Sequence, residues 1–263
     1  MAAIFLLAAL VFGPLWADSG GTAGAPVYSA DSIVNSAAGV PSFFAPNTFI
    51  SIYGQNLSRA TRAITQDDIR GGILPTALSG TNVRVLINHL PADLWYVSPT
   101  LVNVLVSTLY VAGPATLQLE ADGIAGPEVS IMLGSTAPAL WQLDAATVLA
   151  AHLDSSVVNP QAPARAGEII VLFATGLGPT LPAQIPNQVA VAAAQIAAKS
   201  QFQILLNGVA LDSARILYVG AAPGTAGVYQ INLLLPDDAP QNPEIRIATI
   251  ERISPPGRVL CVQ

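Results

Sequence analysis

Cysteine is almost missing from this 263-residue chain, whose single thiol is Cys261. One thiol excludes an intramolecular disulfide and a cysteine-rich zinc site, so apolar packing must stabilise the fold. Basic residues are also scarce, since ten Lys and Arg stand against sixteen Asp and Glu and give a net charge of −6. Nucleic acid is therefore not expected as a partner, because no basic surface is available to neutralise a phosphate backbone.

Charged residues make up only 10% of the chain and hydrophobic residues 52%, which excludes a disordered protein. The 21 Gly and 21 Pro are spread along the whole length and disfavour long helices. From Val27 onward, Gly, Pro, Asn or Asp interrupts short apolar runs at intervals of about 8 to 12 residues, the rhythm of a β-sandwich. The predicted fold class is all-β.

The first 17 residues carry an apolar stretch, Ala2 to Leu15, that is too short and too interrupted by Pro14 for a transmembrane helix. They predict a signal peptide cleaved after Ala17, although no Lys or Arg precedes the apolar stretch. A mis-assigned start and a buried first strand are the alternatives. Residues 18–31 are predicted to be a flexible spacer. No later segment offers a membrane span, so the mature protein is expected to be secreted, periplasmic or on the cell surface.

Two halves of the chain resemble each other. When Pro46–Ser58 is placed beside Ala166–Gly178, the apolar positions coincide, and further matches follow in the same order at offsets of 119 to 129 residues. Three of these pairs are Asn88 with Asn207, Tyr96 with Tyr218, and Asn103 with Asn232. Asn-His and Asn-Gly at the first pair predict hairpin turns, because these residues tolerate positive φ.

The duplication predicts two tandem immunoglobulin-like β-sandwiches. We place the first repeat at residues 32–150, an inter-domain linker at 151–165, where NPQAPA (159–164) excludes regular structure, and the second repeat at 166–263. The stretch Val189–Ser200 is rich in helix formers and could form a short helix, which we interpret as a variable surface insertion.

Six ordered blocks carry a resemblance to a known family. They are IVNSAAG (33–39), PNTFISIYGQNL (46–57), LPTALSGTNVRV (74–85), WYVSPTLVNVLV (95–106), AHLDSSVVNPQAPARAGEIIVLFATGLGP (151–179) and YVGAAPGTAGVYQINLLLP (218–236). Together they resemble the Solibacter-type uncharacterised C-terminal domains of secreted acidobacterial proteins. The resemblance implies exported tandem domains similar to the IPT/TIG type of immunoglobulin-like sandwich, with no established activity. The first copy departs from the family pattern, with Leu101-Val102 where Gln230-Ile231 stands in the second copy.

A short stretch, AHLDSS, places His152, Asp154, Ser155 and Ser156 close together in the sequence. A serine hydrolase needs three groups that converge in space beside an oxyanion hole, which residues this near in sequence rarely do, and no Gly-x-Ser-x-Gly motif is present. The favoured interpretation is a polar loop in which His152 hydrogen-bonds to a carboxylate or to the backbone. A deep polar pocket that also contains Arg165 would favour the enzyme instead.

Metal and cofactor binding are not expected. The two histidines, His89 and His152, lie in different repeats, and the acidic pairs Asp67-Asp68 and Asp237-Asp238 lack the alternating spacing of a calcium loop. Gly176-Leu177-Gly178 lacks the lysine of a phosphate loop.

Aromatic side chains are the main candidates for recognition, because exposed rings stack on sugars and anchor protein interfaces. Trp95 and Trp141 are therefore candidate recognition residues together with His152 and Asp154, although a tryptophan of a sandwich commonly fills the core. Strict alternation would place Trp95 and Tyr96 on opposite faces of their strand, with Tyr96 inward.

The sequence thus favours a non-catalytic extracellular module for adhesion, assembly, or recognition of a polysaccharide or protein. A hydrolytic enzyme with a site at the domain junction and a purely structural spacer are the alternatives. It does not indicate the oligomeric state.

Overall fold

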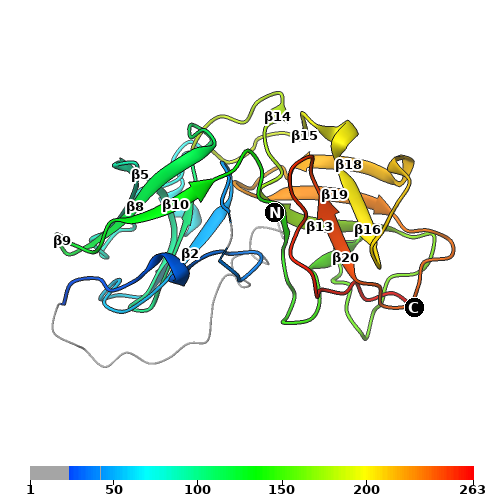
Figure 1. Ribbon diagram of the computed structural model, residues 1–263, viewed down its shortest axis with the longest axis horizontal. Helices are drawn as coiled ribbons and strands as arrows, with labels where there is room; N and C mark the ends of the chain where they lie inside the picture. Colours follow the sequence, from blue (N-terminus) through cyan, green and yellow to red (C-terminus); the bar gives the residue numbers. More distant parts are fainter. Residues whose placement is uncertain (1–23, 42) are drawn as a thin grey trace. The chain divides into compact units, whose positions relative to one another are not determined.

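The structure, a computed structural model, describes residues 24–41 and 43–263, so the predicted signal peptide and part of the predicted spacer lie outside the described residues. Within the described ranges, no helix is long and apolar enough to cross a membrane. The helices described there are four 3-10 turns: η1 (Ala30–Ser32), η2 (Gln66–Asp68), η3 (Lys199–Gln201) and η4 (Ser213–Arg215). The remaining regular structure is β, which confirms the predicted all-β class (Figure 1).

The chain folds into two compact units. The first comprises the described residues up to Ser135 with Ile185–Val189, and the second Thr136–Gln184 with Ala190–Gln263. The change of unit therefore falls between Ser135 and Thr136, earlier than the linker placed at 151–165 by the sequence. The physical reason is strand pairing, because residues 139–140 and 150–152 are strands hydrogen-bonded to a central strand of the second unit.

The first unit consists of two antiparallel sheets. One sheet has the order β1-β2-β7-β6-β3 and the other β10-β8-β4-β5, with β9 also paired to β8. Their strands are β1 (Ile33–Asn35), β2 (Phe49–Tyr53), β3 (Arg62–Ala63), β4 (Val83–Ile87), β5 (Leu90–Pro91), β6 (Asp93–Val97), β7 (Leu101–Leu105), β8 (Gly113–Ala121), β9 (Ile124–Ala125) and β10 (Val129–Leu133).

The core of the first unit joins its two sheets into a sandwich. Ile50 and Val104 of the first sheet lie in one buried cluster with Val85 and Leu117 of the second. Each such fully buried aliphatic side chain contributes about 1.5–3 kcal/mol relative to an exposed one. Burial of alternate residues on β4 and β8 follows from the period of two in these strands.

The second unit repeats this plan. Its larger sheet has the order β11-β13-β19-β18-β15-β14, with β12 also paired to β13, and its smaller sheet the order β17-β16-β20. The strands are β11 (Ala139–Leu140), β12 (Ala150–His152), β13 (Ile169–Thr175), β14 (Thr180–Leu181), β15 (Ala194–Ile196), β16 (Gln203–Leu206), β17 (Val209–Ala210), β18 (Ile216–Ala221), β19 (Tyr229–Leu234) and β20 (Ile245–Ala248).

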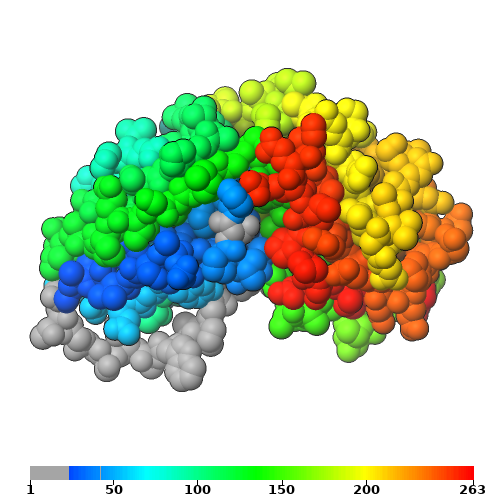
Figure 2. Space-filling view, viewed as in Figure 1, coloured from blue at the N-terminus to red at the C-terminus, as the bar shows by residue number. Residues whose placement is uncertain are grey.

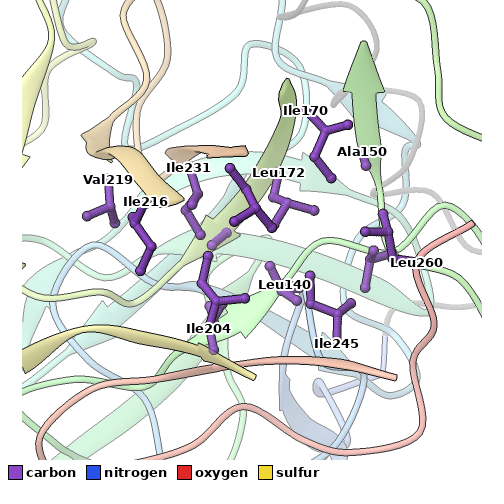
Figure 3. Close-up of a cluster of buried hydrophobic side chains, with 14 of the residues drawn as sticks. Leu140, Ala150, Ile170, Leu172, Ile204, Ile216, Val219, Ile231, Ile245 and Leu260 are labelled. Carbon is purple, nitrogen blue, oxygen red and sulfur yellow. The ribbon is translucent and has the colours of Figure 1, made fainter. Parts of the chain in front are cut away.

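The core of the second unit lies between these two sheets. Ile170 and Leu172 of β13 pack in one buried cluster with Ile204 of β16 and Ile245 of β20 (Figure 3). Strands β16 and β20 pair with each other, and the part of the chain that contains them is drawn in yellow to red at the molecular surface in Figure 2.

The two units share a register that identifies equivalent residues. Ile33 pairs with Ile52 and Asn35 with Ile50 in the first unit, as Ala150 pairs with Leu172 and His152 with Ile170 in the second. Both units then close with a parallel bridge, Phe44 to Leu133 and Ala164 to Val262. The duplication predicted from sequence is therefore a duplication of one immunoglobulin-like sandwich.

A β-bulge recurs at the same place in both units. The register shifts between Leu94 and Tyr96, and again between Ile216 and Tyr218. Tyr96 then pairs with Asn103, and Tyr218 with Asn232, so the residues that the sequence matched between the repeats occupy equivalent positions in the two sheets.

Candidate functional site

A hollow of about 800 Å³ opens in the second unit beside the end of β12 and the start of β13. Its described lining residues lie within 152–168, except for Gln263. They are His152, Leu153, Asp154, Ser156, Gln161, Ala162, Pro163, Arg165, Ala166, Gly167, Glu168 and Gln263. The structure thus brings together His152 and Asp154, which the sequence proposed for recognition, with Arg165 of the enzyme alternative.

His152 ends β12 and begins a tight turn. Its backbone N–H donates to the carbonyl of Ser156 at 2.9 Å, and the N–H of Ser155 donates back to the carbonyl of His152 at 3.0 Å. Ser155 has a φ of 71°, which gives the turn its direction. These backbone hydrogen bonds therefore fix the position from which the side chain of His152 leaves the main chain.

The imidazole of His152 is held on both sides by oxygen acceptors. Nδ1 lies 2.5 Å from Oε1 of Glu168, and Nε2 lies 3.1 Å from the carbonyl oxygen of Ala162. A neutral ring would leave one nitrogen lone pair against an acceptor, so the protonated ring, with two N–H donors, fits this environment. The hydrogen bond to Glu168 accordingly raises the pKa of His152, and the Ala162 carbonyl adds to the rise.

Asp154 is engaged by its own turn. Its Oδ1 accepts hydrogen bonds from the backbone N–H of Ser156 at 2.9 Å and from the Ser156 hydroxyl at 2.6 Å. These bonds lower the pKa of the Asp154 carboxyl, the hydroxyl bond having the larger effect. Ser156 thus donates to Asp154 and not to a histidine base, so the predicted polar-loop interpretation fits better than a catalytic triad.

Glu168 connects the histidine to the turn that contains Arg165. Its second oxygen, Oε2, accepts the backbone N–H of Arg165 at 2.9 Å, while its own N–H donates to the carbonyl of Arg165 at 3.1 Å. Both carboxylate oxygens are therefore used. By contrast, within the described part of the chain no hydrogen bond or ion pair engages the guanidinium of Arg165.

The equivalent place in the first unit has none of these charges. The shared register makes Asn35 the counterpart of His152, and the 120-residue offset of β2 and β13 makes Thr48 and Ala45 the counterparts of Glu168 and Arg165. Asn35 accepts the N–H of Ala37 through its side chain, which closes its own turn. The ionic groups are thus specific to the second repeat.

The two tryptophans proposed for recognition are buried. Trp95 is 9% exposed and Trp141 only 2% exposed, so neither presents a ring face to a ligand. The ring of Trp95 meets Phe49 edge-on, at a centroid distance of 5.1 Å. Both rings are therefore buried, although neither belongs to the hydrophobic cluster between the sheets of its unit.

The expected alternation of Trp95 and Tyr96 is wrong at the β-bulge. Cross-strand partners share a face, which groups Tyr96 with Asn103 and Ser51. Phe49 lies two residues before Ser51 and touches Trp95, so Trp95 shares this face as well. The sequence predicted that Tyr96 points into the core between the sheets. The structure instead places it on the opposite face of its sheet.

Glu168 and Gln161 of the site were missed from the sequence. A signal was present for Glu168, because the repeat alignment sets this charged residue opposite Thr48, where the strand positions on either side match closely. For metals, the described residues hold no group of three or more His, Cys, Asp or Glu placed to bind an ion.

Comparisons with known proteins find only distant similarity. No protein-family model matches the chain, and no curated protein sequence matches it. Among solved structures, the I9–I11 tandem of titin is 11% identical, with a TM-score of 0.24, over 84% of this chain and 62% of that one. The surface glycan-binding protein PbSGBP-B from Prevotella bryantii is 13% identical, with a TM-score of 0.26, over 88% and 41%.

A third match is the mixed-linkage glucan utilization locus SGBP-B of Bacteroides ovatus, in complex with a mixed-linkage heptasaccharide. It is 11% identical, with a TM-score of 0.31, over 84% of this chain and 42% of that one. This chain therefore spans less than two thirds of the length of each of these three proteins. At these identities and scores the likeness carries no argument about ligand or activity.

Proposed function

We propose that this protein is a non-catalytic extracellular binding module that takes a polysaccharide into the hollow of its second unit. The observation that carries the proposal is that hydrogen bonds already hold the side chains of His152, Asp154, Ser156 and Glu168 in place. The two ring nitrogens of His152 face acceptors, and Glu168, Asp154 and Ser156 are committed to fixed hydrogen bonds. Such a site is organised before a ligand arrives, which reduces the entropic cost of binding.

The same contacts argue against the hydrolase alternative. A general base needs a free lone pair within reach of the proton it removes, and both nitrogens of His152 lie against acceptor oxygens. The serine nucleophile of a triad needs a hydrogen bond to that base, whereas the Ser156 hydroxyl donates to Asp154. These contacts therefore support recognition over hydrolysis as the role of the hollow.

The lining favours a hydroxylated ligand over an apolar one. The volume lies in the range of small-molecule sites, but such sites are usually lined by apolar and aromatic side chains. Here the described lining residues include no Phe, Tyr or Trp, and most of them carry polar or charged side chains. The buried centre of a protein–protein interface is typically rich in aromatics and poor in charge, which also fits this hollow badly.

A steric block of the hollow tests the proposal. Ala166 lines the hollow, and Ala166→Trp should fill it, whereas Ala210→Trp makes the same substitution on an exposed strand outside the lining. We expect the wild-type protein and A210W to bind the same members of a panel of soluble polysaccharides by titration calorimetry. A166W, folded by circular dichroism, should lose that binding.

A wild-type protein that binds no polysaccharide, or an A166W variant that binds as well as the wild type, would overturn the proposal. Release of new reducing ends from a bound polysaccharide would instead establish the hydrolase.

A further inference from the structure

One charged group of the hollow has no partner among the described residues. The protonated His152 and Glu168 satisfy each other, and Asp154 is partly satisfied by Ser156. Arg165 is the one described charged residue of the lining whose charged group has no hydrogen-bond or ion-pair partner among the described residues. The guanidinium N–H donors of Arg165 are therefore available to a ligand, and a neutral sugar would leave their charge unpaired.

The position of Arg165 suits it to bind a ligand. Its backbone N–H and carbonyl are both hydrogen-bonded to Glu168, and the preceding residue, Ala164, is hydrogen-bonded to Cys261 and Gln263 of the C-terminal segment. The side chain thus extends from an anchored backbone while the residue itself is exposed. A guanidinium is planar, always charged, and presents a fork of N–H groups that matches a carboxylate.

We propose that the polysaccharide bound in this hollow is acidic and that Arg165 binds the carboxylate of one of its uronate residues. The inference rests on the proposed function of the same hollow. A uronate offers its carboxylate to Arg165. Its hydroxyls can donate to Oδ2 of Asp154, since Ser156 uses only Oδ1, and can accept from the amide of Gln161.

Asp154 also discriminates between anions. Its carboxylate lines the same hollow and repels a densely charged ligand, so a single planar carboxylate per sugar fits better than several sulfate esters. The first repeat supports the assignment, because the counterpart of Arg165 there is the buried Ala45.

The experiment compares ligands that differ only in charge. Oligogalacturonate is titrated into the full chain beside its methyl-esterified form and a neutral glucan oligosaccharide of the same length, and a sulfated galactan serves as the densely charged probe. We expect oligogalacturonate to bind roughly tenfold or more tightly than its methyl ester. The preference should fall as salt is added.

Two arginine variants then separate charge from structure. Arg165→Gln should bring the affinity for oligogalacturonate down to that of the ester, and Arg165→Lys should restore it in part. Arg84→Gln, which removes an exposed arginine from β4 of the first unit, should change nothing. Unchanged thermal unfolding shows that each variant is folded.

The two proposals fail differently. If esterified and unesterified ligands bind alike, if the sulfated galactan binds best, or if R165Q keeps the preference, the inference about Arg165 is overturned while the proposed polysaccharide binding stands. If none of the saccharides binds, the proposed function itself fails.

Discussion

The surroundings of His152 favour its protonated ring over a neutral base. Its side chain is only 17% exposed, and both of its ring nitrogens point at oxygen acceptors, Glu168 Oε1 and the Ala162 carbonyl. Hydrogen bonds that involve a charged group contribute about 1.5–3 kcal/mol, more than neutral ones. The protonated imidazole therefore connects the end of β12 to Glu168, which directly precedes β13, and to the turn that contains Ala162.

This role predicts a pH dependence of stability. Because the pKa of His152 is raised above its ordinary value of 6.5 in the folded protein, the native state holds this proton more tightly than the unfolded chain. The stabilisation is complete below about pH 6.5 and is lost as the pH rises through the higher folded pKa. His152→Gln should thus lower the free energy of unfolding of the second unit by about 1–2 kcal/mol at pH 6.

The difference between wild type and H152Q should shrink by pH 9. Urea unfolding followed by the fluorescence of Trp141 measures it, with the substitution of the exposed His89 by Gln as the control. If the difference in the free energy of unfolding between wild type and H152Q stays constant from pH 5 to 9, the assignment of a protonated His152 in the folded protein is wrong.

Asp93 is a second buried ionisable residue, in the first unit. It is 2% exposed, and neither carboxylate oxygen has a hydrogen-bond partner among the described residues. Burial raises the pKa of Asp93 from 3.8 to about 7. The pKa of Tyr110 is raised too, first by its own burial and then by the charge of Asp93.

The native first unit therefore binds the Asp93 proton more tightly than the unfolded chain, and this stabilisation is lost as the pH rises from about 4 to above 7. Asp93→Asn removes the charge at similar size, so it should raise the free energy of unfolding of the first unit at pH 8 by about 1–3 kcal/mol. At pH 5 the gain should be much smaller. Urea titrations at both pH values measure it, and a variant less stable than the wild type at pH 8 would show that the carboxylate has a stabilising partner.

At the scale of elements, the two Asn-x hairpins show the same construction. Asn88 and Asn207 follow β4 and β16 with positive φ, and each side chain accepts a backbone N–H of the neighbouring strand segment, that of Thr116 and that of Glu244. The hairpins predicted from Asn-His and Asn-Gly are thereby confirmed. The next residue differs, since His89 has a φ of 62° where Gly208 has 79°.

The difference predicts opposite effects of substitution. A non-glycine residue in the left-handed region costs about 1 kcal/mol, and a Cβ on Gly208 would meet nothing within 4 Å, so the cost is one of backbone conformation. Gly208→Ala should therefore destabilise the second unit by about 1 kcal/mol, and His89→Gly should stabilise the first unit by up to about 1 kcal/mol. Urea unfolding of each variant measures both, and effects of the same sign would contradict the argument.

Local patterns predicted the strands and hairpins, but not features that depend on distant partners. The bulge at Trp95 changes which face a side chain occupies, and nothing in the alternation of DLWYV marks it. The helix formers of VAVAAAQIAAK contribute strand β15 instead, because Ala194 and Gln195 pair with β18. The ion pair of His152 with Glu168 arises from the pairing of β12 with β13, which local sequence patterns do not reveal. The one signal in the sequence was that Glu168 aligns with the uncharged Thr48 of the first repeat.

At the scale of the whole molecule, one sandwich occurs twice and carries the charged hollow once. The framework of equivalent strands, bulges and hairpins is common to both units, so these features serve the fold. His152, Arg165 and Glu168 are replaced by Asn35, Ala45 and Thr48, of which Ala45 and Thr48 are fully buried in the first unit. The proposed recognition is thus assigned to the second repeat, and the duplicated fold does not require it.

This asymmetry predicts one ligand site per chain. Titration of a bound polysaccharide fragment should saturate at one fragment per protein, although the fold is duplicated. Hydrogen exchange with the ligand present should slow at the amides of residues 152–168, because the turns that line the hollow lose their opening motions when it is filled. The counterpart amides at residues 35–48 should exchange at the same rate with and without ligand. Two fragments per chain, or equal protection of both turns, would mean that the shared framework binds and that the charged residues of the second repeat do not define the site.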